Sequence, residues 1–335
     1  MIIVRAPVRI PIGGGGTDLP SYYSLYGGEW TSAAINKYVY IALNKRFEKT
    51  LRISYSRTEE VKKPEEVQHP IVRETLKLLG IDGGIEIVSI ADVPSSTGLG
   101  TSGSFTVALL TALHAFLRNS RQSDLPPRRE IAEQACHIAM NLLKEPSGKQ
   151  DEYIAAYGGV TSFLADKNGE VKIEPLYPKK IAPETIRELE NNLLMFYTGI
   201  RRESRDALKI QAQSTQTGEK EIIENLHRVK EIGREIREAL SRGDFHQFGK
   251  LLDIHWQEKI KRQGTSTPQI NRWYEIAKEA GATGGKIMGA GGGGFFLFYC
   301  ENQKDKLRKA MTSLGFKEEQ FHFDLEGVKV IADFI

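Results

Sequence analysis

Apolar and polar positions in the first half of the chain follow two different periods. Residues 38–43, 51–55 and 85–90 are rich in β-branched and aromatic side chains, which is typical of strands. Two further segments, 102–117 and 129–143, place their apolar residues at helical spacing. We therefore expect the first half of the chain to mix strands with helices.

The second half shows the same mixture, with longer helical segments. The amphipathic patterns of 218–241 and 244–262 predict two long helices, because apolar residues recur on one face of each. The segment 178–183 is bounded by prolines and is typical of a link, so we expect an N-terminal domain over 1–180 and a C-terminal domain over 181–335. Shorter elements are expected as strands at 160–164, 171–174, 193–197, 294–299 and 328–332, and as a helix at 303–314.

The composition is ordinary for a globular protein of 335 residues, with 40% hydrophobic and 27% charged residues. The formal net charge of +3 is too small to indicate a nucleic-acid or membrane partner. Only two cysteines occur, Cys136 and Cys300, and each lies in an apolar segment. We therefore expect two buried thiols and neither a disulfide framework nor a zinc site.

The start of the chain and its apolar runs bear on location. Residues 1–7 contain Arg5 and Pro7 and lack a long apolar stretch, so we interpret them as a first strand and not as a signal peptide. No apolar run approaches the roughly 18 residues that a membrane-spanning helix needs. The expectation is a reducing, cytoplasmic location.

Glycine gathers in three clusters, at residues 12–18, 94–104 and 286–296. Glycine runs cost conformational entropy on folding, so they are tolerated where a backbone must pass close to something. The middle cluster leads straight into an apolar helical segment, and Ser102 or a neighbour is suited to cap that helix. The free N–H groups at a helix start bind anions, most commonly phosphate. The sequence therefore predicts a phosphorylated ligand.

Three common nucleotide-binding patterns are absent. None of the clusters matches G-x-x-x-x-G-K-[ST], and none is a G-x-G-x-x-G that opens a helix after the first strand. The H-R-D and D-F-G triplets of protein kinases are missing in the required order. These absences disfavour a P-loop enzyme, a Rossmann dehydrogenase and a protein kinase.

Taken in order, the three clusters resemble the motifs of the GHMP kinases, the family of galactokinase, homoserine kinase, mevalonate kinase and phosphomevalonate kinase. Residues 94–104 are similar to its middle motif, P-x-x-x-G-L-x-S-S-A, from which Thr101 and Gly103 depart. Residues 286–296 are similar to its C-terminal glycine motif, and residues 6–18 to its N-terminal sugar-kinase motif. The resemblance implies an α+β fold, the GHMP kinase fold. A domain like ribosomal protein S5 domain 2 would precede a ferredoxin-like domain, with the acceptor between them.

Within the family, the chain is most similar to the heptose 7-phosphate kinases. This resemblance implies an ATP-dependent sugar-phosphate kinase that phosphorylates the C1 hydroxyl of a heptose 7-phosphate. Two alternatives stay open: a kinase of a free sugar such as fucose or galactose, and a non-catalytic sensor of ATP and sugar with the same fold. A nucleic-acid module is disfavoured by the near-neutral charge. The similarity is carried by Arg9 with 13–20, by 148–153, by 197–199 with Arg202 and Ser204, and by 285–286.

The resemblance also implies roles for single residues. Asp151 would accept or orient the proton of the anomeric hydroxyl, and Arg9 would steady the transferring phosphoryl group. Ser102 would reach Mg²⁺ or a phosphate oxygen. The ATP phosphates would be bound by Pro94, Gly98, Leu99, Gly100, Thr101, Ser102, Gly103 and Ser104. The sugar phosphate would be bound by Gly15, Gly16, Thr17, Asp18, Arg202, Lys286, Gly291 and Gly292.

Structural alternatives exist for four of these residues. Arg9 would otherwise be a surface arginine of a strand. Ser102 would also serve as a helix cap, and Asp151 as a carboxylate favoured at a helix start. Asp18 would close an Asx-type turn over the glycine run. Sequence alone leaves both kinds of role open at each position.

ATP and Mg²⁺ are the expected cofactors, and a sugar phosphate is the expected small-molecule partner, with a homodimer left open. The family usually carries a Mg²⁺-binding glutamate about three turns before its catalytic aspartate, but this chain has Ala139 there. Glu133 and Glu145 are nearby at other helical angles, so we expect ATP, Ser102 and water to hold Mg²⁺. The cations considered for the acceptor's own phosphate are Lys149, Arg201, Arg202 and Lys286.

Overall fold

The strands form two β-sheets in the computed structural model, which describes residues 1–121, 124–177, 179–201 and 205–334. The first sheet contains β1 (Ile2–Gly13), β2 (Gly28–Lys45), β3 (Leu51–Ser54), β4 (Thr58–Val61), β5 (Ile85–Ala91), β6 (Val160–Ala165), β7 (Val171–Pro175) and β12 (Lys329–Asp333). Its main path runs β12-β1-β2-β5-β3-β4, and β6 pairs with both β2 and β7. The second sheet runs β11-β8-β10-β9, from β8 (Leu193–Tyr197), β9 (Gly284–Ile287), β10 (Phe295–Tyr299) and β11 (Lys317–Glu318).

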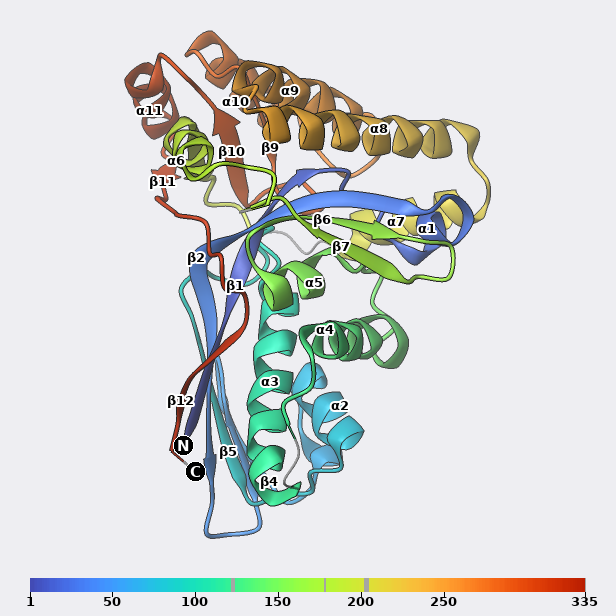
Figure 1. Ribbon diagram of the computed structural model, residues 1–335, viewed down its shortest axis with the longest axis vertical. Coiled ribbons are helices and arrows are strands. Elements are labelled where there is room, and N and C mark those ends of the chain that lie inside the picture. The colour runs from blue at the N-terminus through green and yellow to red at the C-terminus, as the bar shows by residue number, and fades with distance from the viewer. Residues whose placement is uncertain (122–123, 178, 202–204, 335) are drawn as a thin grey trace.

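The helices divide between the two sheets (Figure 1). Near the first sheet lie α1 (Pro20–Tyr26), the short 3₁₀ turn η1 (Pro64–Glu66), α2 (Pro70–Leu79), α3 (Thr101–Arg121), α4 (Arg128–Cys136) and α5 (Gln150–Tyr157). The later part of the chain contributes α6 (Pro183–Asn192), α7 (Arg205–Gln216), α8 (Lys220–Arg242), α9 (Phe245–Ile260), α10 (Pro268–Glu279) and α11 (Lys304–Ser313). The two termini lie side by side, because β12 pairs with β1.

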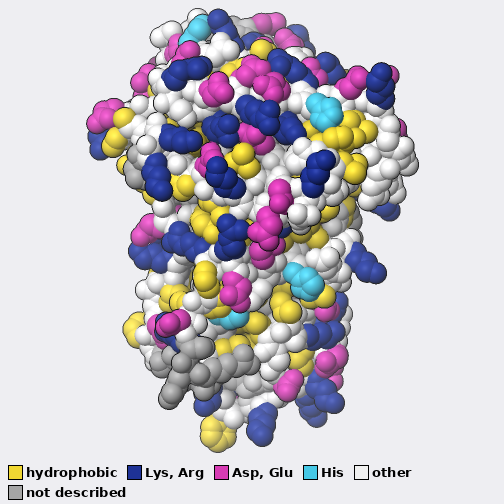
Figure 2. Space-filling model, turned by 45° about the vertical axis from the view of Figure 1, so that its right-hand side comes forward, with side chains coloured by type: hydrophobic (Ala, Val, Ile, Leu, Met, Phe, Trp, Pro, Cys, Tyr) yellow, Lys and Arg dark blue, Asp and Glu magenta, His cyan; other side chains and the backbone are white. Residues whose placement is uncertain are grey.

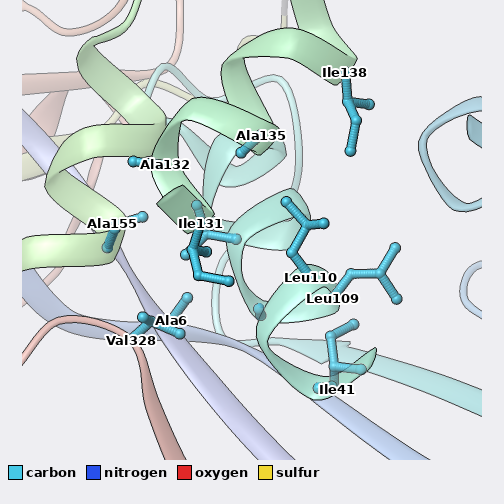
Figure 3. Packing of buried hydrophobic residues seen from close by; sticks show 14 of the residues in the cluster. Ala6, Ile41, Leu109, Leu110, Ile131, Ala132, Ala135, Ile138, Ala155 and Val328 are labelled. Atoms are coloured by element: carbon cyan, nitrogen blue, oxygen red, sulfur yellow. The ribbon is translucent and has the colours of Figure 1, made fainter. Parts of the chain in front are cut away.

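The N-terminal core forms where α3, α4 and α5 pack on one another and on the first sheet (Figure 3). Leu109 and Leu110 of α3 are fully buried, and Ile131 of α4 is 3% exposed. Truncating a buried leucine of this kind to alanine costs about 2–5 kcal/mol. This packing fixes the start of α5 beside the start of α3, where two of the predicted site residues lie.

Strand β1 passes from one hydrophobic core to another, and its Arg9 side chain faces the site. Its register with β2 shifts between Pro7 and Val8. Before the shift, Val4 and the residues two positions to either side of it belong to the N-terminal core. After the shift, Val8, Ile10 and Ile12 belong to the core that is shared with the second sheet. Because side chains alternate along a strand, Arg9 points to the side opposite Val8 and Ile10, where it contacts Asp151 of α5 and the Gly98 carbonyl before α3.

Most expected elements are confirmed, with some changes of extent. The strand expected at 38–43 is part of the 18-residue β2, and the helix expected at 129–143 is α4 followed by a π-helical turn, η2 (His137–Leu142). The two long amphipathic segments form α8 and α9. Both cysteines are buried free thiols, as expected. The domain boundary at residue 180 stays a prediction, while β12 returns from the C-terminal end to the first sheet.

Two surface properties bear on partners. Lysine and arginine side chains are interspersed with aspartate and glutamate over the face shown in Figure 2. This face carries no stripe of one sign, which agrees with the small net charge. No helix in the described part of the chain is both long and apolar enough to span a bilayer.

Candidate active site

A cavity of about 760 Å³ opens where the three glycine clusters meet. Its wall includes Gly16 from the first cluster, Gly98 from the second and Gly289 from the third. The starts of α3 and α5 and the C-terminal end of α9 complete it. Segments that are distant in sequence therefore converge on one concave surface of the size that small-molecule ligands occupy.

The second and third clusters touch through their backbones. Gly98 has φ +83°, and a Cβ built on it would lie 2.6 Å from the Met288 carbonyl oxygen. A Cβ on Gly289 would lie 2.7 Å from the Gly98 Cα, and one on Gly294 would lie 2.2 Å from the Thr97 carbonyl oxygen. Only glycine combines this left-handed conformation with this approach, so the contact explains why both clusters need it.

The expected phosphate loop lies at the start of α3. Pro94, Gly98, Leu99, Gly100, Thr101 and Ser102 all line the cavity. Ser102 is exposed and is the second residue of α3, so it is not the cap that the sequence allowed. The first N–H groups of a helix have no partner within the helix, and an anion in the cavity would supply one.

Gly103 and Ser104, the last two residues of this motif, do not line the cavity and make packing contacts instead. Gly103 lets α3 approach α5, because a Cβ there would lie 2.7 Å from the Cβ of Asp151. Ser104 is 1% exposed, and its hydroxyl donates to the Pro7 carbonyl at 2.7 Å. Both therefore hold the loop in position, and a direct contact to phosphate stays a prediction.

Arg9 and Asp151 form an ion pair at the edge of the phosphate loop. Arg9 donates from Nε to the Asp151 carboxylate at 2.8 Å, and its Nη2 lies 2.7 Å from the same oxygen. Its third contact is a hydrogen bond from Nη1 to the Gly98 carbonyl. The Arg9 side chain is 6% exposed and that of Asp151 is 30% exposed. The pair therefore fixes a carboxylate beside the loop while leaving it open to a ligand.

Glu152 follows Asp151 in the first turn of α5 and also lines the cavity. Burial, with the neighbouring charge of Asp151 as the second cause, raises the pKa of Glu152 to about 8. Two adjacent carboxyl groups thus have different environments, one buried and one paired with arginine. Asp151 is the one that is ion-paired and available to a substrate.

We expect Glu152→Gln to stabilise the protein increasingly as pH rises from 5 to 8. In the unfolded chain the Glu152 carboxyl ionises with the ordinary glutamate pKa of 4.5, whereas in the folded protein it stays protonated up to about 8. The wild type therefore loses stability across this window, at about 1.4 kcal/mol per pKa unit of difference, and the variant does not. Thermal unfolding at pH 5, 6.5 and 8 measures this, and a melting-temperature gap that is the same at all three values contradicts it.

The first cluster is joined to α5 through Asp18. Its carboxylate accepts from the Gly16 N–H at 2.9 Å and from the Gln150 N–H at 3.2 Å. It is 6% exposed, and burial raises its pKa. The Gly16 contact joins Asp18 to the N–H two residues before it, whereas the Asx-type turn of the structural alternative would use the N–H two residues after it. Asp18 lines the cavity together with Gly15 and Gly16. Thr17 is fully buried and its hydroxyl contacts the backbone of Gly14 and Glu29, so it does not reach the cavity.

Four basic side chains, which we call the basic cluster, also line the cavity: His255, Lys259, Arg262 and Lys286. Each is between 2% and 7% exposed. Of the four, sequence reasoning selected only Lys286. The other three lie at i, i+4 and i+7 spacing at the end of α9, where they continue its buried face. That spacing is the feature of the sequence that could have indicated that these three side chains are buried.

The remaining predicted residues divide between the wall and the interior. Gly291 lines the cavity, whereas the N–H of Gly292 donates to the Thr265 carbonyl at 3.0 Å and does not line it. Lys149 pairs with Glu133 at 2.7 Å away from the cavity. Arg201 is exposed and does not line the cavity, and Arg202 lies outside the described residues.

The cavity fits a nucleotide with Mg²⁺ only if the nucleotide supplies most of the metal ligands. Among the described residues, no group of three or more His, Cys, Asp or Glu side chains is arranged to hold a metal ion. Neither Ala139 nor Glu133 lines the cavity, whereas the Ser102 hydroxyl is exposed within it. Mg²⁺ ordinarily keeps several waters and binds through phosphate and one or two protein groups, which this donor set allows.

Two family models match this chain. One describes the GHMP kinases N terminal domain and matches residues 67–159; the other describes the GHMP kinases C terminal region and matches residues 236–317. Together they cover just over half of the chain. The first contains the phosphate loop and Asp151, and the second contains the basic cluster and the third glycine cluster.

Similar proteins include sugar kinases and mevalonate kinases. A D-glycero-alpha-D-manno-heptose 7-phosphate kinase of Campylobacter jejuni is 29% identical over 98% of both chains. An L-fucokinase/L-fucose-1-P guanylyltransferase of Bacteroides fragilis is 28% identical over 92% of this chain but only 36% of its own length. Among solved structures, a D-glycero-D-manno-heptose 1-phosphate kinase from Bacteroides thetaiotaomicron superposes over the full length of both chains, with a TM-score of 0.80 at 24% identity. That structure has the same fold.

Proposed function

The chain belongs to the GHMP kinase family, and we propose that it transfers the γ-phosphoryl group of ATP to the C1 hydroxyl of a heptose 7-phosphate. One observation supports the chemistry most strongly: the Arg9–Asp151 ion pair beside the phosphate loop, on the wall of a cavity lined by all three glycine clusters. The choice of heptose 7-phosphate as acceptor is supported by the Campylobacter jejuni relative, which is similar over nearly its whole length.

Phosphoryl transfer depends mainly on alignment and on neutralising charge, and the residues of the cavity suit both tasks. Asp151 would accept a hydrogen bond from the C1 hydroxyl and take up its proton as the oxygen–phosphorus bond forms. Arg9 would hold the carboxylate in place and offer its charge to the oxygens of the moving phosphoryl group. The bond to ADP breaks in the same step.

The nucleotide would lie along the start of α3. Backbone N–H groups of the first helical turn would contact its phosphates, and the glycines of the loop leave room for them. Mg²⁺, when bound with ATP, would neutralise phosphate charge, with Ser102 as its protein ligand. Asp18 and the backbone of Gly15 and Gly16 would bind hydroxyls of the sugar between this loop and the basic cluster.

We expect heptose 7-phosphate to be the preferred acceptor in a direct comparison. The purified protein would be incubated with ATP and Mg²⁺ and with heptose 7-phosphate, the unphosphorylated heptose, fucose or galactose, and products would be assigned by ³¹P and ¹³C NMR. The phosphorylated acceptor should show a kcat/KM about 100-fold or more above the free sugars, because a site built for a polar group rejects analogues that lack it.

Two results would contradict this proposal. A higher kcat/KM for fucose or galactose would make the protein a free-sugar kinase, as the similarity to the fucokinase half of the Bacteroides fragilis protein allows. Binding of ATP and sugar without any product would identify the sensor instead.

A further inference from the structure

We infer that the basic cluster of His255, Lys259, Arg262 and Lys286 is a preformed subsite for the phosphate that the acceptor itself carries, distinct from the region that holds ATP. The inference rests on the proposed function for the identity of the acceptor. The subsite itself would bind any phosphate monoester dianion, at the wall formed by the end of α9 and strand β9.

Three buried basic side chains of this cluster form no ion pair with any described residue. Lys259, Arg262 and Lys286 are 5%, 7% and 2% exposed. In the described part of the chain their hydrogen-bond partners are backbone carbonyls and one amide, with no carboxylate within ion-pair distance. Buried charges are costly unless paired, so an arrangement of this kind is expected where a ligand supplies the opposite charge.

Mutual repulsion among these groups points the same way. Burial and the nearby charges of Arg9 and Arg262 lower the pKa of Lys286 to about 7. The pKa of Lys259 is also lowered, first by burial and then by the charge of Lys286. A phosphate dianion would reverse both effects, because an opposite charge within a few ångströms favours the protonated amine.

Some buried polar atoms of this cluster have no hydrogen-bond partner. Both ring nitrogens of His255 and the Nε of Arg262 are buried without a hydrogen bond in the described structure. His255 is 3% exposed and lines the cavity. Buried polar atoms are almost always satisfied in folded proteins, so unpaired ones on two residues of the cavity wall indicate hydrogen bonds that a bound ligand would complete. Phosphate oxygens accept from arginine and histidine alike.

Hydrogen bonds fix the position of the cluster in the cavity wall. Arg262 Nη1 donates to Gln211 Oε1 at 2.8 Å, and Gln211 donates to the Gly16 carbonyl at 3.0 Å. Lys286 donates to the Ile12 carbonyl at 2.8 Å. Arg262 and Lys286 are thus fastened to the first glycine cluster, which holds Asp18, whereas Lys259 donates to the carbonyls of Ile287 and Gly289 in the third. C1 and C7 are opposite ends of a heptose, so a sugar whose C1 meets Asp151 would extend its phosphate away from that residue.

The test compares two acceptors in two variants. Lys259→Met and Arg262→Met each remove a charge of the cluster, and each is expected to lower the ratio of kcat/KM for heptose 7-phosphate over unphosphorylated heptose by about 10- to 100-fold, the value of one charged hydrogen bond. Lys261→Met is the control: its side chain is 62% exposed and pairs with Glu258 at 2.7 Å, off the cavity wall. It should leave the ratio unchanged.

A binding measurement separates this inference from the proposed function. Calorimetric titration with inorganic phosphate, without ATP, should show at least about tenfold weaker binding to both cluster variants than to wild type and Lys261→Met. If phosphate binding weakens while no sugar is turned over, the subsite stands and the proposed function fails. If heptose 7-phosphate is a good substrate but the ratio is unchanged in both variants, the subsite is overturned and the function stands.

Two further outcomes overturn the inference. A rise in KM for ATP with an unchanged acceptor ratio would assign the cluster to the nucleotide's phosphates. Equal losses with both acceptors, in variants whose circular dichroism and melting temperature match wild type, would give the cluster a structural role in shaping the cavity.

Discussion

Asp151→Asn is expected to lower kcat by about 10²- to 10⁴-fold, the usual contribution of a positioned acid or base. Asparagine has the same shape, and its amide oxygen still accepts from Arg9. The ion pair at 2.7–2.8 Å is thus replaced by a hydrogen bond from the charged guanidinium to a neutral amide. The proton acceptor is lost while the packing at the start of α5 is kept. Steady-state kinetics with both substrates, at fixed saturating ATP, measures the effect, and KM should change little.

Glu152→Gln is the matched control for this substitution, since it alters the next residue of the same helix. Because pH 7 is below the Glu152 pKa of about 8, the Glu152 carboxyl is largely protonated, and glutamine reproduces its neutral charge state. Its kcat should stay within about threefold of wild type. If Asp151→Asn retains activity within about tenfold of wild type, Asp151 is not the base, and catalysis rests on alignment and Arg9 alone.

Much of the fold was accessible from local patterns. The amphipathic segments that form α8 and α9 repeat apolar residues at helical spacing, and that period survives in any tertiary context. The glycine clusters were informative for a similar reason, because glycine is needed where the backbone has a positive φ or a close neighbour. Gly98 meets both conditions. The resemblance to the GHMP kinases then predicted that the three clusters surround one binding site.

Other features depend on contacts between distant segments, which no local pattern encodes. The contact between Arg9 and Asp151, 142 residues apart, was expected only from the family resemblance, because nothing in the sequence around Arg9 places its side chain at the start of α5. Gly103 was expected at phosphate but keeps α3 close to α5. The cations of α9 were missed because charged residues on an amphipathic helix usually face solvent, whereas Lys259 continues the buried face below Trp256 and Leu252.

Gly98→Ala is expected to lower kcat/KM for ATP by about 100-fold, because it separates the two glycine clusters that form the cavity. The added Cβ would lie 2.6 Å from the Met288 carbonyl oxygen and 3.0 Å from its carbon, both backbone atoms that no rotamer change can move. The loop must shift, and with it the Gly98 carbonyl that accepts from Arg9. Nucleotide binding by calorimetry and steady-state kinetics measure the change.

Gly315→Ala separates the steric effect from the cost of the backbone conformation. Gly315 has the same φ of +83°, but a Cβ there meets nothing within 4 Å. Both variants carry the left-handed strain of about 1–2 kcal/mol, so both should melt earlier than wild type, while only Gly98→Ala should lose affinity for ATP. Should the two variants bind ATP equally well, the contact between the phosphate loop and the third glycine cluster would not be what shapes the nucleotide site. The convergence of the three clusters would then be a feature of packing alone.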